Sequence, residues 1–142
     1  MSIVLITGSS GLIGSESAFF FLKKGFKVIG IDNNLRKTFF GKDGDTLWIR
    51  NKLVKNKNYT HFNCDIRNPD AIKNIFKKFK KNISIVIHAA AQPSHDYAKD
   101  NLHLDFKVNA EGSLNIFHNI QKFCPESKVI FLSTNKVYGD NP

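Results

Sequence analysis

One segment near the N-terminus constrains the fold of this chain more than any other: a short apolar strand that runs into a glycine-rich turn and a helix. The strand covers residues 3–6 (IVLI) and the turn covers residues 7–14 (TGSSGLIG). Glycines allow the backbone to turn tightly and to approach a ligand closely. The start of the helix offers unpaired N–H groups and a partial positive charge to phosphate groups. The segment therefore predicts a seat for a diphosphate.

A second strand that ends in an acid strengthens this interpretation. Residues 27–31 form an apolar run about twenty residues after the glycines, and Asp32 follows it directly. A carboxylate at this spacing accepts hydrogen bonds from both ribose hydroxyls of an adenosine and repels a 2′-phosphate. The residue therefore favours NAD over NADP, although Arg36 is close enough along the chain to weaken that preference.

Strand-like and helix-like segments alternate along the whole chain. We expect strands at residues 2–7, 27–31, 59–63, 83–88 and 128–132, and helices at 11–24, after the Asn68-Pro69 cap and at 102–123. A long polar connection at 33–57 carries a short helix around 46–54. This alternation predicts one α/β domain over residues 1–142, a Rossmann-like doubly wound parallel sheet with strand order 3-2-1-4-5 that stops after the fifth strand.

The polar motifs of the chain fall at the ends of these strands. They are the glycine turn, Asp32, Asp65, residues 88–92 and the pair Ser133-Thr134. In a doubly wound sheet, ligands bind beyond the carboxyl ends of the strands, where the strand order reverses. We therefore expect a single site at this edge.

Several of these residues have competing interpretations. Asp65 could bind the adenine amino group or stabilise the turn that leads to Asn68, and spacing alone does not separate the two roles. His88 is more typical of a core histidine with satisfied nitrogens than of a catalyst. His95 and Asp96 look like a dyad, but adjacent residues rarely orient one another, and we expect both on the surface.

The net charge of +9 raises the question of a nucleic-acid partner. The basic residues are mostly lysines at 52–57 and 73–81, and the aromatic residues follow core spacing instead of lying between the charges. This pattern indicates a solvated basic face, and we expect no nucleic-acid partner.

No apolar run approaches a membrane span, no export signal is evident, and two distant cysteines lack metal-type spacing, so we expect a cytoplasmic protein without membrane contact.

Taken together, these motifs resemble the extended short-chain dehydrogenase/reductase family, the NAD-dependent nucleotide-sugar epimerases and dehydratases. The glycine turn has that family's TGxxGxxG form. Five further motifs follow in family order, at residues 32–33 (DN), 65–67 (DIR), 88–90 (HAA), 108–115 (VNAEGSLN) and 133–140 (STNKVYGD). Within the family, the last motif and residues 91–94 (AQPS) are most similar to the CDP-paratose 2-epimerases and their close relatives.

The resemblance implies a reaction and a set of site residues. Such enzymes transiently oxidise a sugar carbon with bound NAD, present the other face of the ketone and return the hydride. It implies that Thr134 hydrogen-bonds the reacting sugar oxygen and that Gln92 and Ser94 face the sugar. The positions that it implies for contact with the cofactor, or for its support, are Gly8, Gly11, Leu12, Ile13, Gly14, Asp32, Asn33, Asp65, Ile66, Ala89, Ala90 and Asn109.

The chain departs from the family in its catalytic base. That base is a tyrosine with a lysine four residues later, which lowers the tyrosine pKa and holds the nicotinamide ribose. None of Tyr59, Tyr97 and Tyr138 has a lysine at that offset. In the family this pair and the sugar-nucleotide domain come after the VYG turn at 137–139.

We therefore expect the N-terminal, NAD-binding part of a nucleotide-sugar epimerase or dehydratase, inactive by itself. The alternative is a non-catalytic NAD-binding sensor or interaction module of the same fold. A sheet that stops at its fifth strand exposes the apolar residues 129–132, so we also expect a homodimer or aggregate formed through that edge.

Overall fold

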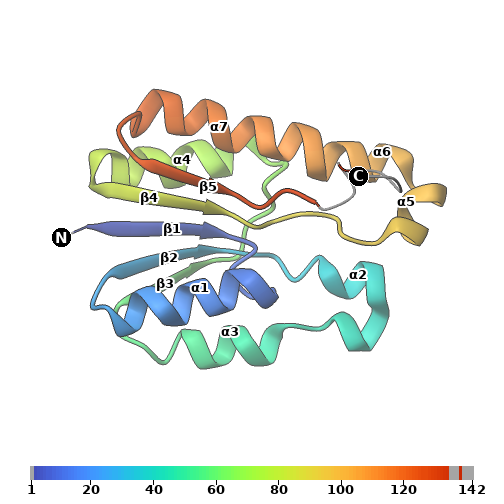
Figure 1. Cartoon of the computed structure of the whole chain (residues 1–142), viewed down its shortest axis with the longest axis horizontal. Coiled ribbons are helices and arrows are strands. Elements are labelled where there is room, and N and C mark those ends of the chain that lie inside the picture. The colour runs from blue at the N-terminus through green and yellow to red at the C-terminus, as the bar shows by residue number, and fades with distance from the viewer. Residues whose placement is uncertain (1, 135–137, 139–142) are drawn as a thin grey trace.

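A five-stranded parallel sheet forms the centre of the molecule, with helices on both faces (Figure 1). The computed structural model describes residues 2–134 and Tyr138. The sheet has the order β3-β2-β1-β4-β5, which confirms the expected doubly wound fold. Its strands are β1 (Ile3–Thr7), β2 (Lys27–Ile31), β3 (Tyr59–Phe62), β4 (Ile83–His88) and β5 (Lys128–Phe131).

Helices α4 and α7 cover one face of the sheet, and α1 and α3 cover the other (Figure 1). The seven α-helices among the described residues are α1 (Leu12–Lys23), α2 (Arg36–Phe40), α3 (Leu47–Leu53), α4 (Pro69–Phe79), α5 (His95–Asp100), α6 (Leu102–Phe106) and α7 (Gly112–Phe123). Short 3₁₀ turns lie at η1 (Gly41–Gly44) and η2 (Lys80–Asn82). None of the helices in this part of the chain is both long and apolar enough to cross a bilayer.

Three segments differ from the sequence-based expectation. The helix expected over 102–123 is divided into α6, a π-helical turn η3 (Lys107–Glu111) and α7. Helices α2 and α5 were not expected, and neither contains a buried residue in the structure. Sequence-based prediction of a helix depends on apolar residues repeating at helical spacing, and a helix with no buried residue does not need that pattern. Neither α2 nor α5 could therefore be predicted in this way.

The core consists of two apolar layers separated by the sheet. Leu5 of β1 lies in the layer that includes Phe76 of α4, whereas Ile6 lies in the layer that includes Leu22 of α1. All five residues of β1 are buried, since alternate side chains of a central parallel strand enter opposite layers. The carboxyl end of β1 is thereby fixed at the middle of the sheet.

The outer strand β5 is exposed along its length. Val129, Ile130 and Phe131 are 44%, 48% and 52% exposed, and Leu132 just beyond the strand is 36% exposed. The apolar edge expected at residues 129–132 is therefore present. Association through this edge stays a prediction.

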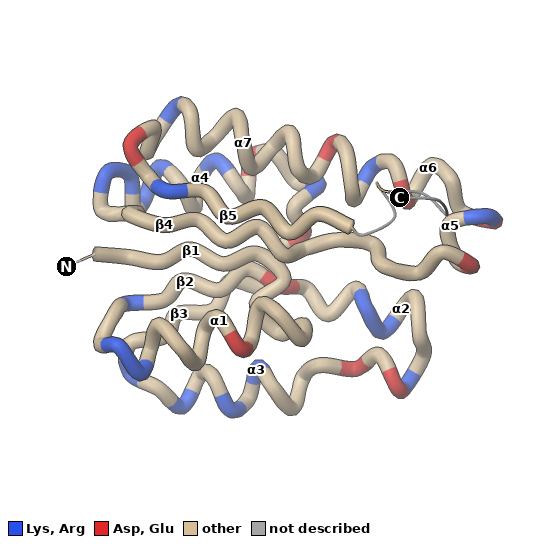
Figure 2. Tube along the Cα trace, viewed as in Figure 1, with Lys and Arg blue, Asp and Glu red and all other residues tan. Residues whose placement is uncertain are grey.

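Lysines and arginines are spread over the outer helices and the loops at the amino ends of the strands (Figure 2). This is the distribution expected of a solvated basic surface. The expectation that the chain has no nucleic-acid partner stays a prediction.

Candidate functional site

A cavity of about 210 Å³ lies beyond the carboxyl ends of the first four strands. It brings together eleven of the twelve residues expected around a cofactor, all except Asn109. The eleven are Gly8, Gly11, Leu12, Ile13, Gly14, Asp32, Asn33, Asp65, Ile66, Ala89 and Ala90. Segments far apart in the sequence therefore converge on one space, as expected for ligand binding at the point where the strand order reverses.

Two glycines of the turn after β1 are required by its geometry. Gly8 has φ +66°, and a Cβ on it would lie 2.8 Å from the backbone of Ala89. A Cβ on Gly14 would lie 2.0 Å from the carbonyl oxygen of Gly8. The turn is held against β2 by a hydrogen bond of 2.8 Å from the Gly8 N–H to the Ile31 carbonyl. This close packing leaves a concave backbone surface facing the cavity.

The start of α1 is open to an anionic ligand. Gly11 is the N-cap residue of α1 and supplies no side-chain hydrogen bond to the helix, and the first turn of α1 contains no acid. Leu12 and Ile13, which begin the helix, are 78% and 51% exposed. The unpaired N–H groups of the helix start are thus available to a phosphate group.

Asp32 follows β2 and is held rigidly at the cavity wall. One of its carboxylate oxygens accepts from the Ser10 N–H at 3.0 Å, and the other accepts from the Asn34 N–H at 2.7 Å. Each carboxylate oxygen has further lone pairs, so the group can still accept hydrogen bonds from a ligand. Arg36 also lines the cavity, but its guanidinium lies 4.4 Å from the centre of the Phe40 ring.

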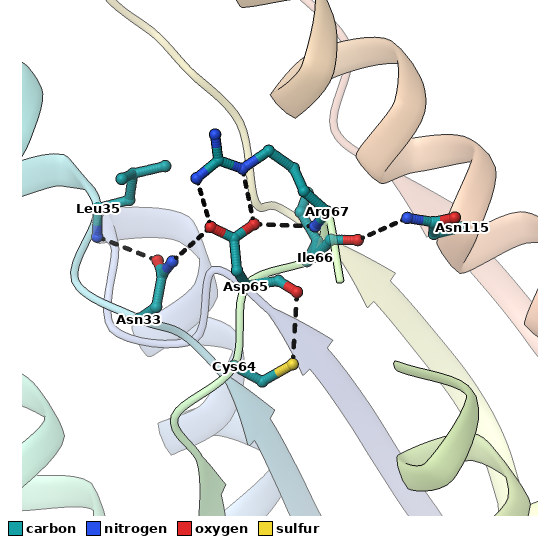
Figure 3. Close-up of polar contacts among 7 residues, drawn as sticks. All are labelled: Asn33, Leu35, Cys64, Asp65, Ile66, Arg67 and Asn115. Carbon is teal, nitrogen blue, oxygen red and sulfur yellow. Dashed lines mark hydrogen bonds and ion pairs between the residues drawn. The ribbon is translucent and has the colours of Figure 1, made fainter. Parts of the chain in front are cut away.

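Asp65 follows β3, and its carboxylate is engaged within its own turn (Figure 3). Arg67 donates to both carboxylate oxygens, from Nε at 2.9 Å and from Nη2 at 2.6 Å, and its backbone N–H donates at 2.8 Å. Asn33 donates a further bond at 2.9 Å. Burial acts to raise the pKa of Asp65, but the bonds from Arg67 and Asn33 outweigh it and lower that pKa. Of the two roles left open by the sequence, the observed contacts correspond to stabilising the turn.

The same turn is also bonded to α7 (Figure 3). Asn115 Nδ2 donates to the Ile66 carbonyl at 3.0 Å. Arg67 and Asn115 occur in the sequence motifs at 65–67 and 108–115. Arg67 bonds Asp65 within its own turn, whereas the partner of Asn115 is 49 residues away and is brought beside it only in the folded chain.

Asn109 and Gln92 bind each other outside the cavity. Asn109 accepts from the Gln92 N–H at 2.8 Å and donates to the Gln92 carbonyl at 3.2 Å. The Gln92 side chain is buried and donates to Asp105 at 2.9 Å and to the Ser94 carbonyl at 2.9 Å. Ser94 caps α5 by accepting from the Tyr97 N–H. The residues expected to face a sugar thus use their polar groups to hold this loop, and their contact with a substrate stays a prediction.

His88 is a core histidine, as expected. It is 1% exposed, and its ring nitrogens are bonded to Thr7 Oγ1 at 2.6 Å and to Ser113 Oγ at 2.9 Å. Burial lowers the pKa of His88 to about 4. His95 and Asp96 lie on the surface, also as expected, with side chains 61% and 94% exposed.

Thr134 is exposed just beyond β5 and does not line the cavity. The rest of its motif, apart from Tyr138, lies outside the described residues. The role of the Thr134 hydroxyl at a sugar oxygen therefore stays a prediction.

Comparison with known proteins agrees with this arrangement. Residues 4–142 match the model of the NAD dependent epimerase/dehydratase family. The chain is 33% identical over 137 residues to CDP-paratose 2-epimerase of Salmonella typhi, covering 96% of this chain and 38% of that protein. It is 34% identical over 145 residues to UDP-glucuronate 4-epimerase of Thermodesulfobacterium geofontis, covering 100% of this chain and 42% of that protein.

A solved structure is similar over the same region. The UDP-glucose 4-epimerase of Thermus thermophilus in complex with NAD aligns with a TM-score of 0.73 and 30% identity, covering 93% of this chain and 37% of that one. The chain thus spans about two fifths of the length of the relatives that it matches.

Proposed function

This chain belongs to the NAD-dependent epimerase/dehydratase family, and we propose that it forms the N-terminal, NAD-binding part of a nucleotide-sugar epimerase or dehydratase. The observation that carries the proposal is the shared cavity, in which the glycine turn and Asp32 face the same space. The Gly8 carbonyl oxygen occupies the place that a Gly14 Cβ would take, and Gly8, Gly11 and Gly14 line the cavity with backbone alone, so the residues present fit a diphosphate cofactor.

Each part of the cavity has a distinct role in this proposal. The turn at 8–14 and the start of α1 bind the diphosphate, and the Asp32 carboxylate accepts the ribose hydroxyls. Its negative charge disfavours a 2′-phosphate, which makes NAD the preferred cofactor over NADP. Ala89 and Ala90 leave room beside the sheet edge because their side chains are small. NAD, when bound, supplies a hydride acceptor that returns the hydride to the sugar.

For the substrate we propose a nucleotide sugar, with activity like that of the CDP-paratose 2-epimerases. Support comes from the motifs at 91–94 and 133–140 and from the similarity to the Salmonella typhi enzyme. In this proposal Thr134 hydrogen-bonds the sugar oxygen at the carbon that is oxidised. The proton itself requires a base, and the Tyr-x-x-x-Lys pair of the family is not among these 142 residues.

The second candidate is a non-catalytic NAD-binding sensor or interaction module of the same fold, since the same cavity serves NAD binding in either case. Both candidates predict that the 142-residue chain binds NAD and turns over no nucleotide sugar by itself. They differ in the gene: a tyrosine–lysine pair encoded after Pro142 favours the enzyme, and a stop codon at that point favours the module.

Calorimetric titration of the 142-residue chain with NAD and NADP tests the cofactor proposal. We expect NAD to bind more tightly than NADP, and Asp32→Ala to remove most of this preference. Asp96→Ala is the matched control, because Asp96 is an acid whose side chain is 94% exposed and lies outside the cavity. Absence of NAD binding by the wild-type chain would refute the proposed function.

A further inference from the structure

A buried polar pair lies behind the glycine turn and joins segments fifty residues apart. The hydroxyl of Tyr59, the first residue of β3, lies 2.9 Å from Oγ of Ser9 in the turn. Tyr59 is 6% exposed and Ser9 is 0% exposed. Neither residue lines the cavity, so neither is a candidate for ligand contact.

Gly30 is what allows Tyr59 to reach the turn. Strand β2 lies between β3 and β1, so the tyrosine side chain must cross β2 to meet the residues that follow β1. A Cβ on Gly30 would lie 1.9 Å from the Tyr59 hydroxyl and 2.6 Å from Ser9 Oγ. The three residues therefore form one unit, in which a glycine on the middle strand makes room for a hydrogen bond across it.

Ser9 depends on this bond for its position. Its backbone N–H lies 3.4 Å from the Ile31 carbonyl, which is long for a hydrogen bond, whereas its side-chain contact with Tyr59 is 2.9 Å. Burial raises the pKa of Tyr59 to about 12, so the hydroxyl remains neutral at ordinary pH. The only other polar contact of this hydroxyl among the described residues is His61 Nδ1, at 3.5 Å.

We propose that Tyr59 is a positioning residue for the diphosphate-binding turn and acts through Ser9. It fixes the turn in its ligand-ready conformation before the ligand arrives, so binding does not have to order the turn. The inference rests on the proposed NAD-binding function and adds a residue that lies behind the site. Without the hydroxyl, Ser9 Oγ is left buried beside an apolar ring, and the turn loses its side-chain hydrogen bond to β3.

Tyr59→Phe tests the proposal because it removes the hydroxyl and keeps the ring. We expect NAD to bind about two- to tenfold more weakly, the range that corresponds to one neutral hydrogen bond. Ser9→Ala is expected to weaken binding by the same factor, and the double variant by no more than either single variant, because both remove the same bond. Gly30→Ala displaces the Tyr59 hydroxyl and is expected to weaken binding at least as much.

A comparison of ligands separates positioning from general loss of structure. ADP-ribose carries the diphosphate and is expected to follow NAD, whereas adenosine lacks it and is expected to bind all variants equally. Equal NAD affinity of wild type and Tyr59→Phe, additive losses in the double variant, or an equal loss for adenosine would each overturn the inference. If Tyr59→Phe fails to fold, Ser9→Ala alone decides between these outcomes. Failure of the wild-type chain to bind NAD refutes the proposed function instead, so the two failures are distinguishable.

Discussion

Mild acid should weaken this fold through His88, and the hydrogen bonds around its ring explain why. The Thr7 hydroxyl accepts from the Ala90 N–H at 3.2 Å and can therefore donate its own proton to His88 Nδ1 at 2.6 Å. Nε2 then carries the ring proton and donates to Ser113 Oγ at 2.9 Å. The Ser113 hydroxyl in turn donates to the Asn109 carbonyl at 2.7 Å. Neutral His88 thus satisfies every donor and acceptor in this chain of bonds.

Protonation would disturb that arrangement. A second N–H, at Nδ1, would meet the Thr7 hydroxyl, whose own proton would lose its acceptor. Burial also disfavours the charged ring and lowers the pKa of His88 from 6.5 to about 4. As pH falls, the unfolded chain therefore takes up the proton before the folded chain does. The stabilisation is complete above pH 6.5 and is lost between pH 6.5 and pH 4.

The pKa difference sets the size of the effect. A shift from 6.5 to about 4 corresponds to about 3 kcal/mol in the free energy of unfolding, of which about 2 kcal/mol is lost by pH 5. Asp45 and Asp65 have pKa values below the ordinary 3.8, so their contributions to the free energy of unfolding are lost only below the pH range in which His88 acts. The pKa of His61 is also lowered, chiefly by burial, and it adds in the same direction.

Urea unfolding followed by circular dichroism at pH 7 and pH 5 measures this contribution. His88→Gln removes the titrating ring, so we expect its loss of stability between the two pH values to be smaller than that of wild type by about 2 kcal/mol. His61→Gln isolates the second buried histidine, and His118→Gln is the control, because His118 is exposed on α7. An undiminished pH dependence in His88→Gln would refute the argument.

Three further predictions concern the turn, the Asp65 network and the outer strand. Gly14→Ala places a Cβ 2.0 Å from the Gly8 carbonyl oxygen, so we expect a loss of about 1–3 kcal/mol in urea unfolding together with weaker NAD binding. Arg67→Lys removes the two-point contact with Asp65, and NMR titration should show a higher carboxyl pKa, with at most about 1 kcal/mol of stability lost because the pair is partly exposed. Ile130→Lys should reduce self-association through β5 in light scattering, and a monodisperse wild-type monomer at high concentration would contradict that expectation.

The sequence was most informative where one periodic pattern determines a whole element. Strand-helix alternation with buried apolar runs was enough to predict the sheet order, because parallel crossovers have a preferred hand and loops are short. The residues expected around the cofactor met in one cavity for the same reason: they follow strands that end at one edge. Asn109 is the exception: it lies on the π-helical turn η3, and its side chain is bonded to the backbone of Gln92 outside the cavity, a pairing that helical periodicity does not reveal.

Side-chain hydrogen bonds between different strands could not be predicted from the sequence. The bond between Tyr59 and Ser9 depends on the register of β2 against β3 and on the absence of a side chain at Gly30. The pairing of Asp65 with Arg67 lies within three residues, yet spacing alone allowed a ligand role as well. A sequence pattern identifies which residues reach an edge of the sheet, but the partners of their polar atoms depend on angles and distances that only the folded chain fixes.

Two buried polar contacts, one on each side of Gly8, explain how a glycine-rich turn can be rigid. Thr7, just before Gly8, is bonded to His88 on the β4 side, and Ser9, just after it, is bonded to Tyr59 on the β3 side. Between them Gly8 adopts φ +66°, a conformation that glycine visits freely in an unfolded chain. Local sequence therefore permits the turn, while the strands on either side select one conformation of it. On this view the shape of the diphosphate seat is a property of the assembled sheet, which is why substitutions at positions outside the cavity should change ligand affinity.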